Sequence, residues 1–262
     1  MLCQIFFATT WLVGITAAEN AIIATEGSNP PIQNVPLYPA SDNQPHEFDV
    51  NQILTPDCWL EATLAAVVRV DPSKITQMLH DNSDGTVTVS LFDPFNLSAL
   101  IPPPKVNKKN FVQTLEYQNS HATWVQVIQD ALNPLVNGTV FNGKGGYATL
   151  AFSAIYGETA IYSTCDQLLS LASKATVAPI VLSSKGDVSG PLVEGHTYTV
   201  ENVAQVDGSS GVTMRNPWGI VNENIWGVET SKGVKNLGHG EFDISNDKAQ
   251  VQCAGVAHLQ NL

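Results

Sequence analysis

The chain is short of basic residues and of long apolar runs, and each shortage excludes a class of function. Its 262 residues include 12 Lys and Arg against 24 Asp and Glu, which gives a net charge of −12 at pH 7. Nucleic-acid-binding domains gather Lys and Arg on one face, so we expect no nucleic-acid partner. No stretch after residue 18 is long and apolar enough for a membrane span. The acidic excess makes copies of the chain repel one another, and we expect a monomer.

Several motifs of enzymes and metal proteins are also absent. The chain has no Gly-x-Ser-x-Gly motif, and the glycines of residues 143–146 lack the spacing of a phosphate-binding loop. The four cysteines lie too far apart for a zinc-finger pattern. The segment 81–85 places its glycine one position too early for an EF-hand. We therefore expect no metal site and no cofactor.

The N-terminus has the features of a secretory signal peptide. Residues 2–18 contain no charged side chain, and their apolar stretch is followed by the small residues Thr16-Ala17-Ala18. This pattern predicts a signal peptide over residues 1–18 and a secreted protein, with a buried apolar helix as the alternative. Residues 19–48 include five prolines and are predicted to form an extended arm or a pro-segment.

The cysteine count constrains the pairing. Cys3 would leave with the signal peptide, so Cys58, Cys165 and Cys253 would remain. In an oxidising compartment two of three cysteines pair and one stays a thiol. If Cys58 is a nucleophile, the predicted disulfide joins Cys165 and Cys253.

Two Asn-x-Ser/Thr tripeptides begin at Asn96 and Asn137. Such tripeptides accept N-linked glycans in secreted proteins, although they also arise by chance. We predict that both asparagines are glycosylation sites.

The spacing of apolar residues changes along the chain and predicts an α+β fold. Residues 49–178 mainly predict helices, the first of which begins at Thr55-Pro56-Asp57 and ends before Pro72. Residues 179–262 mainly predict strands separated by Gly-rich turns. The further helices are expected over 73–79, 124–138, 147–156 and 163–172, and the strands over 86–91, 179–182, 196–206, 212–215 and 241–244.

Cys58 lies in the first turn of the first predicted helix. The free amides and partial positive charge of a helix N-terminus stabilise a thiolate and lower the pKa of a thiol. A cysteine in an apolar helix is usually structural, so a catalytic role also requires a base close to the sulfur.

His196 is the histidine whose sequence context best suits that base. It follows Gly195 on a predicted strand, where it shares the inward face with alternate apolar residues. Asn216 precedes Pro217, which favours an extended backbone, and its amide could accept a hydrogen bond from one His196 nitrogen. Trp218 could cover that bond and exclude water. Taken singly, an inward histidine is more often a core residue, and Asn-Pro is an ordinary turn signal.

A fourth polar group stands upstream of the cysteine. Gln52 precedes Cys58 by six residues, and its side-chain amide could donate to an oxyanion together with the Cys58 backbone amide. One such donor typically contributes about 10²–10³ in rate.

Together these residues resemble the calpain-type peptidases, which belong to the papain-like cysteine peptidases. The strongest similarity lies, in chain order, in QILTPDCW (52–59), GHTYTV (195–200) and RNPWG (215–219). Weaker similarity lies in residues 124–135, 145–157 and 240–242. The resemblance spans residues 49 to 250, and three motifs in the right order are more specific than any one.

The resemblance implies a papain-like two-lobe fold and an endopeptidase. A helical lobe, residues 49–178, would carry the cysteine, and a β-rich lobe, residues 179–262, would carry the histidine and asparagine. Protein or peptide substrate would lie between them and form a thioacyl-enzyme. By resemblance, Cys58 is the nucleophile, His196 the general base and acid, Asn216 the orienting residue and Gln52 the oxyanion donor, with support from Trp59, Trp218 and Gly195.

The chain departs from the family pattern at positions that bear on chemistry. Pro56 replaces the glycine usual before Asp-Cys-Trp, and Glu61 stands where an apolar residue is usual. Conventional members bind calcium in the catalytic core, so calcium is possible by resemblance. However, Asn222 and His239 occupy positions near the end of the core where acids would serve, although Glu223 and Glu241 remain. We expect weak or no calcium requirement.

Two other functions remain open. One is a catalytically silent papain-like module that binds a peptide or a partner, which Pro56 and Glu61 favour. The other is an acyltransferase of transglutaminase type, although that chemistry normally orients its histidine with aspartate rather than asparagine.

Overall fold

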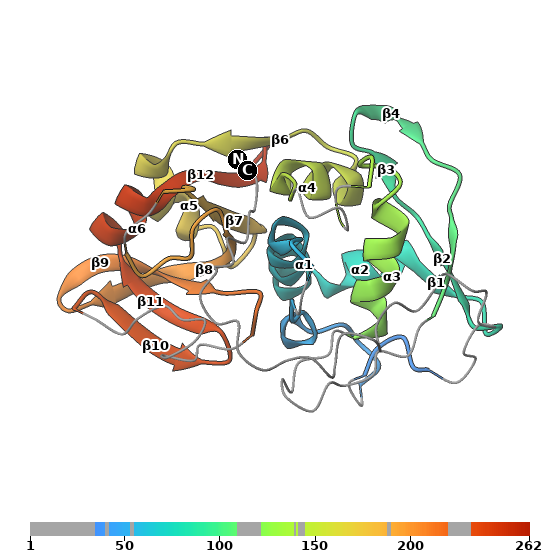
Figure 1. Ribbon diagram of the computed structural model, residues 1–262, viewed down its shortest axis with the longest axis horizontal. Helices are drawn as coiled ribbons and strands as arrows, with labels where there is room; N and C mark the ends of the chain where they lie inside the picture. Colours follow the sequence, from blue (N-terminus) through green and yellow to red (C-terminus); the bar gives the residue numbers. More distant parts are fainter. Residues whose placement is uncertain are drawn as a thin grey trace, which may run out of the picture.

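The computed structural model describes residues 35–39, 42–52, 55–108, 122–138, 140, 145–187, 190–219 and 232–262. The predicted signal peptide and most of the predicted arm lie outside these residues. The described part mixes helices and sheets, in agreement with the predicted α+β class (Figure 1). Among the described residues, no helix is both long enough and apolar enough to cross a membrane.

The helices lie mostly in the first two thirds of the chain. They are η1 (Glu47–Asp49), α1 (Cys58–Val70), α2 (Pro72–Met78), α3 (Thr123–Leu132), α4 (Ala148–Tyr156), η2 (Cys165–Gln167), α5 (Leu168–Ala172) and α6 (Asn246–Gln252).

The strands form three sheets within the described residues. One has the order β1 (Leu79–Asp81), β2 (Thr86–Val89), β5 (Lys105–Asn107), and a second pairs β3 (Phe92–Asp93) with β4 (Asn96–Leu100). The large antiparallel sheet has the order β10 (Val234–Gly238), β11 (Glu241–Ser245), β9 (Ser209–Arg215), β8 (Thr197–Val206), β7 (Ile180–Ser184), β12 (Cys253–Leu259), β6 (Ala160–Ser163).

α1 is the central helix of the molecule. Every residue from Cys58 to Val68 is buried, as expected for a helix that is apolar on most of its circumference. It contacts β7 and β8 on one side and α2 and α4 on the other (Figure 1). It ends at Val70. The next residue, Asp71, caps α2 by accepting a hydrogen bond from the Lys74 amide, and Pro72 is the first residue of α2.

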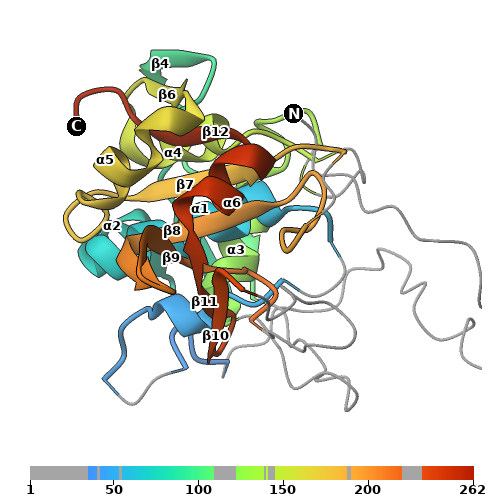
Figure 2. The same ribbon diagram turned by 90° about the vertical axis from the view of Figure 1, so that its left-hand side faces the viewer.

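The large sheet separates two hydrophobic clusters. Val181 of β7 belongs to the cluster that contains α1, α3 and α4, whereas Ile180 and Leu182 face a second cluster with α5. This alternation follows from the two-residue period of a strand. Figures 1 and 2 show α1 on one side of the sheet and α5 and α6 on the other.

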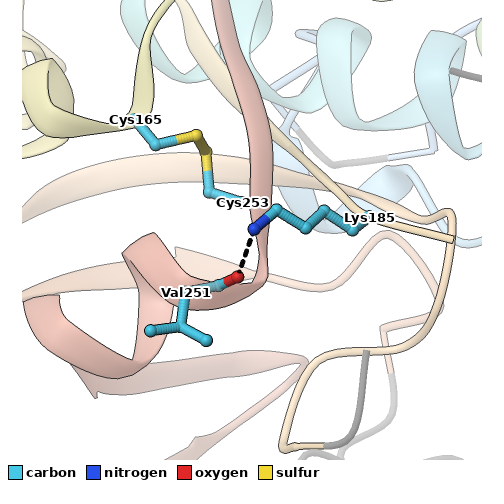
Figure 3. The surroundings of a disulfide bond; sticks show 4 residues. All are labelled: Cys165, Lys185, Val251 and Cys253. Carbon is cyan, nitrogen blue, oxygen red and sulfur yellow. Dashed lines mark hydrogen bonds between the residues drawn. A yellow bond between two sulfur atoms is a disulfide. The ribbon is translucent and has the colours of Figure 1, made fainter. Parts of the chain in front are cut away.

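The predicted disulfide is confirmed. Cys165 of η2 is bonded to Cys253 at the start of β12, across 88 positions of sequence (Figure 3). Beside it, Lys185 Nζ donates to the backbone oxygen of Val251 at 2.6 Å. The disulfide ties the start of β12, and the hydrogen bond ties the end of α6, to segments that precede them by many residues.

The structure differs from several predicted element boundaries. α1 begins at Cys58 rather than at Pro56, because the Asp57 carbonyl accepts the first helical hydrogen bonds from Leu60 and Glu61. The helix predicted over 163–172 is a strand, a 3-10 turn and the short α5. The helix predicted over 124–138 ends at Leu132 and continues as turns.

The structure describes the burial of two residues of the predicted arm and the exposure of both predicted glycosylation sites. Leu37 and Tyr38 are buried in the first cluster, and the Leu37 carbonyl accepts from the Trp124 amide at 3.2 Å. Asn96 and Asn137 are both exposed, which leaves them accessible to modification.

Candidate active site

The backbone of His196 is fixed by Ser184 of β7. The His196 amide donates to Ser184 Oγ at 2.9 Å, and its carbonyl accepts from the Ser184 amide at 2.8 Å. Gly195, immediately before it, has φ 58°, a conformation that glycine adopts without steric cost. These contacts set the direction in which the imidazole leaves the start of β8.

The predicted His196–Asn216 contact is present in the structure. His196 Nε2 lies 2.9 Å from Asn216 Oδ1, and both residues are buried. Asn216 Oδ1 also accepts a hydrogen bond from the Trp218 amide at 3.0 Å. A backbone amide can only donate, so this atom is an acceptor and His196 Nε2 must carry the proton. In the neutral ring Nδ1 is therefore the basic nitrogen.

Aromatic rings enclose the imidazole. The Trp218 ring centroid lies 4.5 Å from that of His196, and the Tyr198 ring meets it edge-on at 5.0 Å. Burial lowers the pKa of His196 to about 4, although the hydrogen bond with Asn216 acts in the opposite direction. The neutral imidazole is the form favoured at neutral pH in this state of the protein.

Cys58 is buried at the first position of α1, so the structure confirms its expected place at a helix N-terminus. A hydrogen bond of 2.8 Å from Thr199 Oγ1 to the Ala62 carbonyl joins α1 to β8. Ala62 lies one turn after Cys58, and Thr199 lies three residues after His196. The bond therefore fixes the cysteine end of α1 against the strand that begins at the histidine.

The Cys58 sulfur differs from the predicted thiol, because it is disulfide-bonded in the structure. The other half of this bond lies outside the described residues. The predicted free thiol applies to the three cysteines that follow the predicted signal peptide, whereas the full sequence contains four. An even number allows every cysteine to be paired.

Gln52 lies beside the Asn216-Pro217-Trp218 turn, but its side-chain amide donates to residues of its own segment. Its backbone amide donates to the Pro217 carbonyl at 2.7 Å, which joins the segment before α1 to the Asn216-Pro217-Trp218 turn. Its side-chain Nε2 donates to the Thr55 carbonyl and lies 3.3 Å from Asp57 Oδ1. An oxyanion would have to replace one of these acceptors.

Trp59 packs against the Gly145-Gly146 segment. A Cβ atom on Gly146 would lie 2.5 Å from the Trp59 indole, so only glycine fits there without displacing the ring. Trp59 is buried directly beside Cys58. Gly146 therefore helps to determine the position of the residue that follows the cysteine.

Sequence reasoning missed Arg215, a buried cation at the end of β9. Arg215 Nη2 donates to the Val50 carbonyl at 2.8 Å, and the guanidinium lies over the Phe48 ring. Burial lowers the pKa of Arg215, whereas nearby carboxylates, first among them Glu47, raise it. The available signal was its place directly before Asn216 in the Arg-Asn-Pro-Trp motif.

Sequence reasoning also missed a polar cluster behind Cys58. Asp57 and Glu61 are both fully buried, and Gln129 of α3 donates to both carboxyl groups. The available signals were an acid inside an apolar helix at Glu61 and a glutamine on the buried face of α3.

The residues considered for calcium do not assemble a metal site among the described residues. No group of three or more His, Cys, Asp or Glu side chains in that part of the chain could hold an ion. His239 is exposed and its ring contacts Phe48 at 5.8 Å. Asn222 and Glu223 lie outside the described residues.

No protein-family model matches the chain, and no curated protein matches it significantly. The resemblance to calpain-type peptidases therefore rests on the motifs in the sequence.

Proposed function

We propose that the chain is a secreted cysteine endopeptidase with a papain-like two-lobe arrangement and calpain-type catalytic motifs. The observation that supports this best is the buried His196–Asn216 pair, whose geometry leaves Nδ1 of the imidazole as the base. A general base oriented by a third group is the arrangement that thiol catalysis requires.

In the proposed reaction the Cys58 thiol loses its proton to His196 Nδ1, and the sulfur attacks the carbonyl carbon of the scissile peptide. The resulting oxyanion is stabilised by the Cys58 backbone amide and the Gln52 side chain. His196 then returns the proton to the leaving amine, which departs and leaves a thioester. Water, deprotonated by His196, attacks the thioester, releases the acid product and restores the thiol.

The proposal applies to the form in which the Cys58 sulfur is reduced. The disulfide at Cys58 replaces the nucleophilic thiol, and Cys58 is buried in the complete chain. Opening that bond and exposing the sulfur must precede catalysis. Peptidase activity of a chain that keeps residues 1–18 should therefore depend on a mild reductant. Removal of the predicted signal peptide before the bond forms would instead leave Cys58 as a thiol, because Cys165 and Cys253 are bonded to each other.

The second candidate function is a catalytically silent module that binds a peptide or partner. The observations that favour it are the disulfide-bonded, buried Cys58 and the local engagement of the Gln52 amide. If the Cys58 bond persists in the mature protein, the site has no nucleophile, and its histidine and asparagine are structural.

Labelling with an epoxide inhibitor of thiol proteases distinguishes the two candidates. The protein is prepared both as the full chain and by secretion, which removes the predicted signal peptide, and each form is treated with inhibitor before and after mild reduction, with Cys58→Ala as the control. Labelling that maps to Cys58 after reduction, with hydrolysis of a protein substrate, supports the peptidase. Folded, reduced protein that stays unlabelled from mildly acidic to neutral pH supports the silent module. Incorporation of an amine in place of hydrolysis would instead identify the acyltransferase.

We further propose that calcium is not required, because the described residues offer no acidic ligand set. The reduced enzyme should keep its activity in excess chelator. Loss of activity in chelator that calcium restores would contradict this.

A further inference from the structure

A buried hydrogen-bonded chain of side chains leads from the centre of the molecule to the predicted oxyanion donor. Asp57 and Glu61 lie one helical turn apart, at the N-cap and in the first turn of α1, and both are fully buried. Gln129 Nε2, from α3, lies 2.6 Å from Asp57 Oδ2 and 2.8 Å from Glu61 Oε1. One amide group therefore bridges two carboxyl groups.

The second oxygen of Asp57 faces Gln52. Asp57 Oδ1 lies 3.3 Å from Gln52 Nε2, whose other acceptor is the Thr55 carbonyl. A primary amide has two N–H groups, and both have acceptors here. An oxyanion must therefore displace one of the two acceptors, and the longer contact, 3.3 Å to Asp57 Oδ1, is the weaker one to give up, so Asp57 and an oxyanion would compete for that N–H of Gln52.

The strength of this competition depends on the charge of Asp57. An ionised carboxylate accepts a hydrogen bond about twice as strongly as a neutral group does. Burial raises the pKa of Asp57 to about 7, whereas the hydrogen bonds from Gln129 and Gln52 act in the opposite direction. Asp57 thus changes charge near neutral pH.

The charged groups around Asp57 and Glu61 come from several elements. Burial raises the pKa of Glu61 and the Asp57 charge adds to the effect, whereas the Arg215 guanidinium of β9 opposes it. Arg215 is in turn surrounded by Glu47 of η1, Glu201 of β8 and Glu241 of β11. The α3 residue that touches both carboxyl groups is the uncharged Gln129.

We propose that Asp57 and Gln129 are positioning residues for the oxyanion donor of the proposed peptidase. Ionised Asp57 holds the Gln52 amide in the turn before α1, and protonated Asp57 releases it to the oxyanion. Gln129 stabilises the ionised carboxylate and so sets the pH at which the release occurs. This inference rests on the proposed function, because it assigns a regulator to the same site.

The test separates a step that forms an oxyanion from one that does not. Peptide hydrolysis passes through an oxyanion, whereas alkylation of the Cys58 sulfur by iodoacetamide does not. Both rates are measured on the reduced full chain between pH 5 and 9. In the wild type kcat/KM should fall about tenfold per pH unit above neutrality, as expected when one group must be protonated, while alkylation shows no such fall.

Two variants change the proposed regulator. Asp57→Asn cannot ionise, so the fall in kcat/KM at high pH should disappear while the alkylation profile stays the same. Gln129→Met keeps a side chain of similar size but removes the N–H groups that bridge the two carboxyl groups. The ionised form of Asp57 is then less stable, so the fall in kcat/KM should move to higher pH by about one unit. Asp166→Asn, at an exposed acid, is the matched control and should behave as the wild type.

The outcomes distinguish this inference from the proposed function. If the fall in kcat/KM at high pH persists in Asp57→Asn, or if Gln129→Met does not shift that fall, the positioning role is refuted. The proposed function is not affected by either result. A wild-type alkylation profile with the same fall also refutes it, because the thiol or histidine would then be the titrating group. Reduced wild-type protein that hydrolyses no peptide refutes the proposed function and this inference together. If Asp57→Asn does not fold, Gln129→Met still decides the question.

Discussion

The Asn216 side chain selects the tautomer of neutral His196 through one oxygen atom. Oδ1 accepts from the Trp218 amide and from His196 Nε2, so the direction of the second hydrogen bond follows from the first. Trp218 lies over the imidazole and shields this bond from water. The orientation of the base is thus set by a short turn in which three successive residues cooperate.

Replacing Asn216 by alanine should remove this control. Asn216→Ala leaves both tautomers of His196 accessible, and kcat/KM of the reduced enzyme should fall about 10²-fold, the lower end of what a positioned base contributes. Asn202→Ala, at an exposed asparagine on β8, is the control. Steady-state hydrolysis of a peptide substrate measures the effect. Activity of Asn216→Ala within a factor of two of the control would contradict an orienting role.

Single residues also mark the limit of what the sequence could predict about the site. The His196–Asn216 contact was predictable because both residues stand in short motifs with recognisable neighbours. The Gln129 contacts were not, because Asp57 and Glu61 lie 72 and 68 positions away in sequence. Without the packing of α3 on α1, a glutamine in an amphipathic helix has no identifiable partner.

Among the elements, the best-predicted ones have clear start and stop signals. α4 ends at Gly157, whose φ of 69° is the left-handed conformation expected at a helix C-terminus. α1 ends before Pro72 as predicted. The helix predicted over 163–172 was wrong because Cys165 begins a 3-10 turn and Ser163 belongs to β6.

Other elements escaped prediction because their patterns depend on the tertiary structure. β12 runs from Cys253 to Leu259 with almost every residue buried, since it lies inside the large sheet with a hydrophobic cluster on each face. A strand covered on both faces loses the apolar–polar alternation that marks a strand in the sequence. β6 is short, with mostly half-buried residues, and its pairing with β12 defines it.

The contact between Gly146, just before α4, and Trp59 of α1 predicts the effect of adding one methyl group at Gly146. Gly146→Ala places a Cβ 2.5 Å from the Trp59 indole, so the ring or the 145–147 backbone must move. Overpacking of this kind costs about 1–3 kcal/mol. Denaturant unfolding should show this loss, and kcat/KM should fall because Trp59 adjoins Cys58.

Gly208→Asn is the comparison for that variant. Gly208 has φ 80° with nothing within 4 Å of the added Cβ, and asparagine tolerates this conformation better than other residues. It should unfold nearly as the wild type does. Equal free energies of unfolding for Gly146→Ala and Gly208→Asn would contradict the prediction, because the 145–147 backbone would then move away from the Trp59 ring without loss of stability.

At the scale of the whole molecule, buried carboxyl groups predict how stability depends on pH. Burial raises the pKa of Glu201 to about 8, with Glu47 and Glu241 adding to it, and raises that of Asp57 to about 7. Between pH 6.5 and 8 the unfolded chain has already ionised these groups, so the folded state binds more protons. Stability should fall as pH rises, by about 2 kcal/mol over this window.

Thermal unfolding at a series of pH values measures this slope. Glu201→Gln should make it less steep, with the part due to Asp57 remaining, whereas Glu158→Gln, at an exposed acid, should leave it unchanged. The pKa of His196 is lowered, so this group acts in the opposite direction, but mainly below pH 6.5; within the window it adds only about 0.4 kcal/mol of stability as pH rises. A wild-type stability that rises between pH 6.5 and 8 would contradict the prediction.

The place of β12 in the large sheet has a consequence for how the protein is made. Its residues lie between β7 and β6 in the sheet, yet they follow both strands by many positions in sequence, so the ribosome adds them well after both neighbours. Until Cys253–Leu259 emerges from the exit tunnel, β6 has no neighbour in the sheet and Cys165 lacks its partner. The large sheet, whose strands β8 and β9 adjoin His196 and Asn216, can therefore be completed only after β12 has left the exit tunnel, so a nascent chain that stops short of Cys253 leaves both β6 and Cys165 unpaired.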